Sequence, residues 1–204
     1  AFTYYKAQYQ LENARMLADC LSVFAGNTKT LTQYTFPYQV SETDLLYQKS
    51  SNNQRTGFYI KSPEGERLLR LRDISIEDQY SYRNGKIVYA AYESHPRWRW
   101  VSYNVIKLLD VATGQQRTLT HKSRYFSPDI SADGKTIVAN SVALDGRSAL
   151  TFLTADNGNP FKTIINDSVN YFSNPKFLND STVITVLRNK DATTAIAAVD
   201  VLSG

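Results

Sequence analysis

One stretch of the sequence combines residue types that carry binding energy in many protein interfaces. It is "ESHPRWRWVSY", from Glu93 to Tyr103, in which two tryptophans and two arginines alternate. Trp and Arg are enriched at binding hot spots, because a large flat ring and a planar donor fork both make extensive contacts. A bare connection between two strands needs only about two to five residues. The alternative is that Trp98 or Trp100 fills the gap between neighbouring sheets.

Positive charge is concentrated around the same stretch. Residues 95–125 contain six Lys or Arg and one acid, Asp110, in a chain whose formal net charge is +4. We therefore predict a binding surface for an acidic protein or peptide partner. Its residues are His95, Arg97, Trp98, Arg99, Trp100, Tyr103, His121, Arg124 and Tyr125. A nucleic-acid partner is not expected, because a pI of about 9.0 without a recognised motif meets only the first criterion for one.

Other chemically capable residues lack the spacing that catalysis or metal binding requires. The two histidines, His95 and His121, are far apart, and neither has a Cys or a carboxylate at zinc-ligand spacing, so we predict no metal site. No glycine-rich phosphate loop occurs, and we predict no cofactor. A serine hydrolase needs Gly-x-Ser-x-Gly, and the nearest string, "DGRSALT" around Ser148, lacks the second glycine. The sequence predicts no catalysis by these residues.

Paired carboxylates for glycoside hydrolysis need not be close in sequence, so spacing leaves that chemistry open. Four aspartates, however, lie near Gly or Pro, where Asp commonly serves turns. They are Asp129, Asp133, Asp145 and Asp156. We favour turn roles for all four.

The elements that position these residues follow a period. In "SPDISADGKTIVAN", from Ser127 to Asn140, a strand, a two-residue turn at Asp133-Gly134 and an apolar run predict a β-hairpin. The first apolar residues of the second strands recur 42, 50 and 46 residues apart, at Leu45, Ile87, Ile137 and Val183. Glycines after the third strands recur 49, 44 and 46 residues apart, at Gly65, Gly114, Gly158 and Gly204. A repeat of about 40–50 residues with four short strands predicts an all-β fold, a β-propeller. A β-sandwich is the alternative, but it gives no reason for the shared period.

The predicted organisation is one helix followed by four-stranded antiparallel sheets, the blades of the propeller. Apolar residues at helical spacing predict a helix over 4–25, so 1–33 would be a helix with its connector. The blades are expected at 34–73, 74–122, 123–168 and 169–204. The last has three strands before Gly204, so the propeller is expected to be incomplete, unless the N-terminal segment completes a blade. No apolar run approaches the ~20 residues of a membrane span.

The repeat resembles a known family. "YFSPDISADGKTIVA", with the weaker copies "YFSNPKFLNDSTVITV" and "FPYQVSETDLLYQ", is similar to the WD-like repeat of Tol-B-type propellers of bacterial envelopes, over roughly 34–204. "HPRWRWVSYNVIKLLDVATGQQRTLT" also resembles a segment of large envelope proteins from Bacteroidetes-type bacteria. In those proteins a metallopeptidase-like region precedes the propeller, and 4–25 would be its tail.

The resemblance implies a bacterial envelope protein, in the periplasm, with a non-catalytic propeller for binding or scaffolding. The alternative is an accessory propeller of a peptidase, of the prolyl-oligopeptidase type or a metallopeptidase, whose catalytic domain lies outside these residues. No His-Glu-x-x-His occurs, so no peptidase activity carries over to this chain. Propellers have many unrelated functions, so the fold alone does not select one of them.

Overall fold

The computed structural model describes residues 29–98, 100–165 and 169–201. The helix predicted over 4–25 lies outside these residues. In the described part the chain is all-β, which confirms the predicted fold class at that level, and no helix there is long and apolar enough to cross a membrane. The strands form four separate antiparallel sheets rather than the two stacked sheets of a sandwich.

Each sheet follows the order of its strands along the chain. The first sheet contains β1 (Thr32–Gln39), β2 (Leu45–Ser51), β3 (Gln54–Ser62) and β4 (Gly65–Leu71). The second contains β5 (Ser81–Arg83), β6 (Lys86–Ser94), β7 (Ser102–Asp110) and β8 (Gln116–Thr118). The third contains β9 (Tyr125–Ile130), β10 (Thr136–Val142), β11 (Ser148–Thr154) and β12 (Pro160–Ile164). The fourth contains β13 (Val169–Phe177), β14 (Thr182–Asn189) and β15 (Thr194–Asp200).

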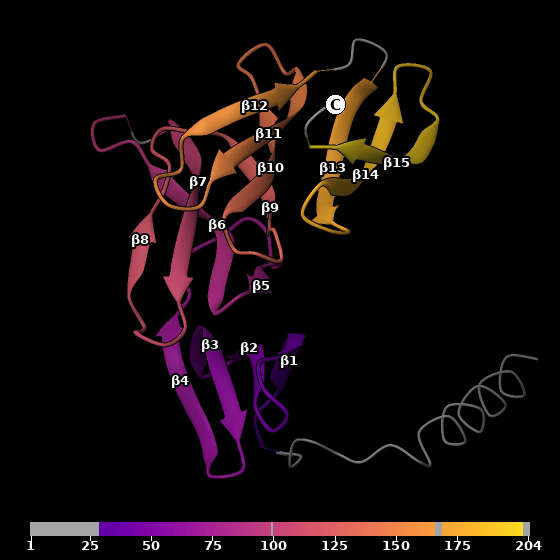
Figure 1. Ribbon diagram of the computed structural model, residues 1–204. Helices are drawn as coiled ribbons and strands as arrows, with labels where there is room; N and C mark the ends of the chain where they lie inside the picture. The colour runs from indigo at the N-terminus through magenta and orange to yellow at the C-terminus, as the bar shows by residue number, and fades with distance from the viewer. Residues whose placement is uncertain (1–28, 99, 166–168, 202–204) are drawn as a thin grey trace, which may run out of the picture.

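The four sheets follow one another around an open arc, with β1, β5, β9 and β13 on its inner side and β4, β8 and β12 on its outer side (Figure 1). The second strands of the second and third sheets, β6 and β10, are buried on both faces, because each is packed between two neighbouring sheets. In β6 the five residues from Ile87 to Ala91 are all fully buried. This is why β6 and β10 appear in the sequence as continuous apolar runs rather than as alternating patterns.

Three hydrophobic clusters join the sheets in sequence. The first and second sheets pack through Phe58, Tyr80 and Tyr89, whose rings meet edge to face at 5.0 and 5.3 Å. The second and third sheets share a cluster that includes Val88 and Ile137. The third and fourth share one that contains, among others, Val138, Leu150, Phe152, Phe172 and Val183. Each sheet therefore depends on its neighbours for burial of its apolar residues.

The inner strands of three sheets share a backbone irregularity. Phe36, Ser127 and Asn174 have positive φ angles of 52, 48 and 48°, and each precedes a proline. The register of the strand pair shifts at each of these positions, which marks a β-bulge. Left-handed backbone at a residue other than Gly is uncommon, and the residue before a proline normally adopts an extended conformation. The bulges therefore bend the inner strands at the same end of each of these three sheets.

The turns at the opposite end are joined from sheet to sheet. The Asn84 side chain donates to the carbonyl of Asp133 at 2.9 Å, and the Asp133 amide donates to the Asp180 carboxylate at 3.1 Å. The predicted two-residue turn at Asp133-Gly134 is wrong in length. The turn runs over 131–135, and only Gly134 has a positive φ, of 71°. The hydroxyl of Ser131 donates to the Asp133 carboxylate and so stabilises this longer turn.

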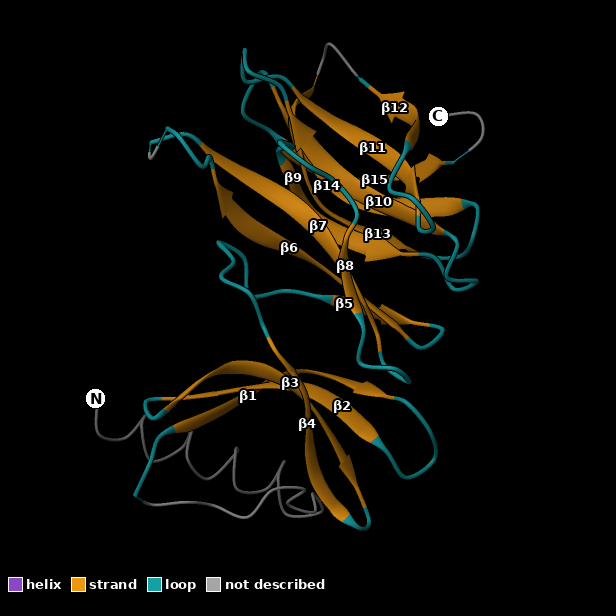
Figure 2. Ribbon diagram, turned by 90° about the vertical axis from the view of Figure 1, so that its left-hand side faces the viewer, coloured by secondary structure: helices purple, strands orange, loops and turns teal. Residues whose placement is uncertain are grey.

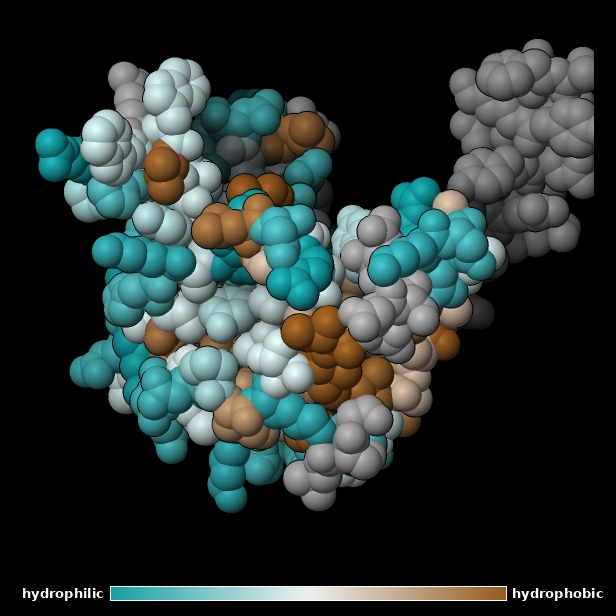
Figure 3. Space-filling view, turned by 90° about the horizontal axis from the view of Figure 1, so that it is seen from above, coloured by the Kyte–Doolittle hydropathy of each residue, from teal (hydrophilic) through white to brown (hydrophobic). Residues whose placement is uncertain are grey.

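The face of the fourth sheet that points away from the third sheet carries exposed apolar side chains. Val186 and Ile196 are paired across β14 and β15, and their side chains are 37 and 76 % exposed. The corresponding pair in the third sheet, Asn140 and Leu150, is buried. Figure 3 shows hydrophobic side chains gathered on the surface over the third and fourth sheets.

Candidate functional site

One end of the sheets carries the residues that the sequence singles out for binding. We call it the connector face. It holds the turns β2–β3 (52–53), β6–β7 (95–101), β10–β11 (143–147) and β14–β15 (190–193), and the links that lead into the next sheet. The β6–β7 turn, which we call the Trp loop, projects from this end at the upper left of Figure 2.

Hydrogen bonds fold the Trp loop into a compact shape. The Nδ1 atom of His95 accepts hydrogen bonds from the backbone amides of Arg97 and Trp98, at 3.1 and 3.0 Å. The amide of His95 donates to the carbonyl of Val101, and the amide of Val101 donates to the carbonyl of Trp98, both at 2.9 Å. Glu93 and Ser94 belong to β6, so the true loop is shorter than the stretch that the sequence suggested. The loop is a defined turn with a histidine as its internal acceptor.

Both tryptophans point outward. Trp98 is 59 % exposed and Trp100 is 97 % exposed, so neither fills a gap between sheets. The alternative that these rings are packing residues is therefore wrong. The guanidinium of Arg97 lies 5.3 Å from the Trp98 ring centre, which is a cation–π contact. Arg99 lies outside the described residues.

The second half of the predicted surface lies beside the start of β7. The amide of Asn104 donates to the carbonyl of Ser123, and its side chain donates to the carbonyl of Tyr125 at 2.6 Å. These bonds hold the link over 119–124 at the same end of β7 as the Trp loop. His121 and Arg124 in this link are exposed.

Tyr103 and Tyr125 are half-buried and pack against the clusters between the sheets. Burial raises the pKa of Tyr125. These two tyrosines support the surface rather than form its exposed part.

A cleft that the sequence does not predict, which we call the Glu77 cleft, opens on the same face, between the inner strands. It has a volume of about 420 Å³ and is lined by Glu77, Phe126, Ser127, Asn140, Val142, Tyr171, Ser173 and Asn174. The Glu77 carboxylate accepts hydrogen bonds from the amide and the hydroxyl of Ser127, at 2.6 and 2.7 Å. Ser127 in turn reaches Asn174 on β13 at 3.3 Å. The Ser-Pro and Asn-Pro pairs at the two bulges are the sequence signal that could have located this cleft.

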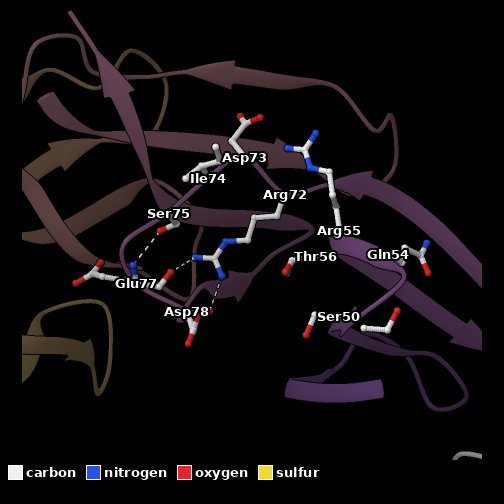
Figure 4. Close-up of a pocket in the computed structure, with 11 residues that line it drawn as sticks. Ser50, Gln54, Arg55, Thr56, Arg72, Asp73, Ile74, Ser75, Glu77 and Asp78 are labelled. Carbon is white, nitrogen blue, oxygen red and sulfur yellow. Dashed lines mark hydrogen bonds between the residues drawn. The ribbon is translucent and has the colours of Figure 1, made fainter. Parts of the chain in front are cut away.

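A second cleft lies between the first sheet and the link that leads into the second sheet (Figure 4). Its volume is about 330 Å³, and it is lined by Ser50, Ser51, Gln54, Arg55, Thr56, Arg72, Asp73, Ile74, Ser75, Glu77 and Asp78. Arg72, at its base, is 5 % exposed, and burial lowers its pKa. Its guanidinium donates to the backbone carbonyls of Glu77, Asp78 and Gln79, at 2.6, 2.5 and 3.0 Å. Arg72 therefore fixes the link that leads from the first sheet into the second.

Asp73 joins that link to the second sheet. Its carboxylate contacts the ammonium of Lys107 at 2.8 Å, the side-chain amide of Gln116 at 2.9 Å and the hydroxyl of Tyr89 at 3.3 Å. Burial would raise the pKa of this carboxyl, but the hydrogen bond and charge of Lys107, helped by Gln116 and Tyr89, lower it below its ordinary value. The folded protein therefore holds Asp73 in its ionised form.

This pKa shift predicts an acid-dependent loss of stability. Because the pKa of Asp73 is lower in the folded protein, its contribution is present at neutral pH and is lost as pH falls below about 4. We expect the difference in unfolding free energy between the wild type and Asp73→Asn to shrink from pH 7 to about pH 3. Urea unfolding at several pH values measures it. Lys107→Met should remove much of the same pH dependence, and an unchanged slope in Asp73→Asn would contradict the assignment.

The residues considered for catalysis have structural partners. The Ser148 hydroxyl donates to the Asn140 side chain at 2.6 Å and accepts from the amide of Phe172 at 3.1 Å, so it joins the third sheet to the fourth. The turn role expected for Asp129 is wrong. Asp129 is buried in β9 and accepts from the Phe177 amide and the Lys176 ammonium, at 2.8 and 2.9 Å. Within the described ranges, no three His, Cys, Asp or Glu side chains group as metal ligands would.

The remaining turn assignments have mixed outcomes. Asp133 and Asp145 accept hydrogen bonds from the amides of Lys135 and Arg147, both at 3.0 Å, which confirms their turn roles. Asp156 lies in the β11–β12 turn, where its backbone carbonyl accepts from Arg117.

Together, the consecutive antiparallel sheets and their open arc define the class of the protein: a β-propeller. Comparison with solved structures finds the same fold in TolB proteins, which confirms the resemblance at the level of the fold alone. TolB from Acinetobacter baumannii matches with a TM-score of 0.59 and 15% identity, over 79% of this chain and 39% of that chain. A TolB-type protein from Agrobacterium tumefaciens matches with a TM-score of 0.56 and 16% identity, over 78% of this chain and 58% of that chain.

Peptidase propellers match as well. The acylaminoacyl peptidase from Pyrococcus horikoshii has a TM-score of 0.55 and 9% identity, over 84% of this chain and 31% of that chain. The chain thus spans between 31 and 58% of the length of these three proteins. No protein-family model and no curated protein matches the sequence.

Proposed function

We propose that this chain is a non-catalytic binding module of a bacterial envelope protein, which holds an acidic protein or peptide at its connector face. The observation that carries the proposal is the exposure of Trp98 and Trp100 on a loop with a defined shape. An ordered loop loses little conformational entropy on binding, and exposed Trp rings are typical anchors. The envelope location follows from the resemblance of the repeat to Tol-B-type propellers.

Charge supports the choice of an acidic partner. Arg97, His121, Lys122 and Arg124 are exposed on or beside the Trp loop. A cationic rim attracts an anionic partner, and its attraction weakens with salt. The Glu77 cleft opens on the same face and offers the aromatic side chains of Phe126 and Tyr171. A partner that contacts the Trp loop and extends toward the inner strands would reach this cleft.

The tryptophans give the test of this function. We expect Trp100→Ala to change the unfolding free energy by no more than about 0.5 kcal/mol, because the side chain is exposed. The same change should weaken binding about tenfold or more if the ring is an anchor. Fluorescein-labelled hexaglutamate is the probe, followed by anisotropy at increasing salt. Leu144→Ala is the matched control, because Leu144 is 94 % exposed on another turn of the same face.

Arg97→Ala should also weaken hexaglutamate binding and reduce its dependence on salt. Hexalysine should not bind. If hexaglutamate binds the wild type, Trp100→Ala and Arg97→Ala equally well, the Trp loop is not the binding surface.

A second candidate function is that of an accessory propeller attached to a peptidase. The likeness to the acylaminoacyl peptidase favours it, although that likeness concerns the fold alone. Reading the sequence on both sides of these residues tests it. A Gly-x-Ser-x-Gly elbow or a His-Glu-x-x-His motif there would favour the peptidase.

A further inference from the structure

We propose that His95 makes the Trp loop sensitive to pH: its neutral imidazole holds the loop in shape, and protonation releases it. The consequence for binding rests on the function proposed above, but the structural switch does not. Histidine suits such a role, because its charge normally changes between about pH 5 and 8.

The switch follows from the hydrogen bonds of one atom. The Nδ1 atom of His95 accepts from the amides of Arg97 and Trp98. It can do so only while it carries a lone pair, which the neutral ring provides. In the imidazolium ion both ring nitrogens carry a proton and both are donors. The two amides would then face a third donor, and both hydrogen bonds would be lost.

The equivalent turns of the third and fourth sheets show the same bond made without histidine. In the β10–β11 turn the Asp145 carboxylate accepts from the amide of Arg147 at 3.0 Å. In the β14–β15 turn the Asp191 carboxylate accepts from the amide of Thr193 at 3.0 Å. The hydrogen bond from the Arg147 amide lowers the pKa of Asp145, and those from the hydroxyl and the amide of Thr193 lower the pKa of Asp191. Both aspartates therefore stay acceptors well below neutral pH. In the β6–β7 turn the same task falls to a histidine, whose Nδ1 atom can accept only in the neutral ring.

The groups around His95 do not replace the lost acceptor. The Tyr103 ring, on β7, lies tilted with its centre 6.2 Å from the imidazole. Glu93, on β6, is paired with Tyr103 in the register of the two strands. Within the loop, the Arg97 guanidinium stacks on Trp98 and adds a second positive charge. Outside the loop, Arg124 forms an isolated parallel β-bridge with Asn104, which is the third residue of β7.

Protonation of His95 should change the Trp loop alone and leave the sheets folded. The loop is exposed, so its freed amides can bond to water, and none of the clusters between the sheets includes Trp98 or Trp100. We therefore expect the loop to lose its shape at acid pH while the sheets stay folded.

The chain reports on this loop directly, because its two tryptophans, Trp98 and Trp100, are both in the loop. We expect tryptophan fluorescence of the wild type to show a transition between pH 8 and 5.5. Amide exchange at Arg97 and Trp98, corrected for the intrinsic pH dependence, should lose about tenfold of its protection over the same range. Far-UV circular dichroism should not change.

Two variants separate His95 from the other histidine. His95→Asn should remove the transition, because an Asn side-chain oxygen can accept the same bonds at every pH, as Asn157 and Asn179 do in other turns. His121→Asn should keep it. A flat wild-type profile, or a transition that survives in His95→Asn and disappears in His121→Asn, would overturn the proposal.

Binding is measured separately with hexaglutamate at pH 7.5 and 5.5. Weaker binding at pH 5.5 in the wild type, but not in His95→Asn, would support both the switch and the binding function. If the fluorescence transition occurs and hexaglutamate binds at neither pH, the switch stands and the proposed function fails.

Discussion

Replacing Arg72 with alanine is expected to lower the free energy of unfolding by about 3–5 kcal/mol. The guanidinium satisfies three backbone carbonyls of the link between the first and second sheets, and it also bonds to the side chain of Gln48. Alanine would leave these acceptors without their donor and would open a cavity beside Tyr89, whose ring centre lies 5.3 Å from the guanidinium carbon. Urea unfolding, followed by circular dichroism, measures the loss.

Arg70→Ala is the matched control. Arg70 precedes Arg72 on the chain, lies in β4 and is exposed, so its removal should cost no more than about 0.5 kcal/mol. Equal effects of the two substitutions would show that Arg72 does not hold the link. Loss of the first sheet alone, with the other sheets intact, would show that its influence stays local.

A second large effect is expected at Gly158, in the β11–β12 turn. Gly158 has a φ of 71°, and a Cβ there would lie 2.3 Å from the carbonyl oxygen of Leu119. Gly158→Ala must therefore both adopt a left-handed conformation and displace the backbone of the link after β8. We expect a loss of about 3 kcal/mol or more in unfolding free energy.

Gly114 provides the control, because it occupies the corresponding turn of the second sheet. Its φ is 68°, and a Cβ there would meet no atom within 4 Å. Gly114→Ala should therefore cost only the backbone term, about 1–2 kcal/mol. The comparison separates the steric clash with Leu119 from the cost of the left-handed backbone. Equal losses at the two positions would rule out the contact with Leu119 as the cause.

The repeat made the fold predictable. The second and third sheets each have a left-handed glycine in the turn after the third strand, Gly114 and Gly158, and an apolar run in the second strand. The repeated structure therefore leaves a repeated pattern in the sequence. The exposed Trp loop was predictable in place, because alternating Trp and Arg residues exceed what a turn needs. Its shape was not, since it depends on Nδ1 of His95 accepting two particular amides.

Other features depend on backbone geometry that the sequence does not display. The Glu77 cleft joins residues about fifty positions apart, through a left-handed residue at Ser127. Asp129 follows a proline, which suggested a turn, but the bulge before it turns its carboxylate toward the amide of Phe177 in the next sheet. In both cases the decisive partner lies in another repeat.

The hydrogen bonds between neighbouring sheets have a consequence for how the molecule assembles. The residues they join are 47 to 50 positions apart: Asn84 with Asp133, Asp133 with Asp180, Glu77 with Ser127 and Asp129 with Phe177. Each of these hydrogen bonds therefore spans a single repeat. The described part behaves as a one-dimensional array in which each sheet is coupled to its nearest neighbours. During synthesis, each new sheet can dock on the one before it as soon as a single repeat has emerged from the ribosome. In the folded state, cooperativity passes from each sheet to its neighbour.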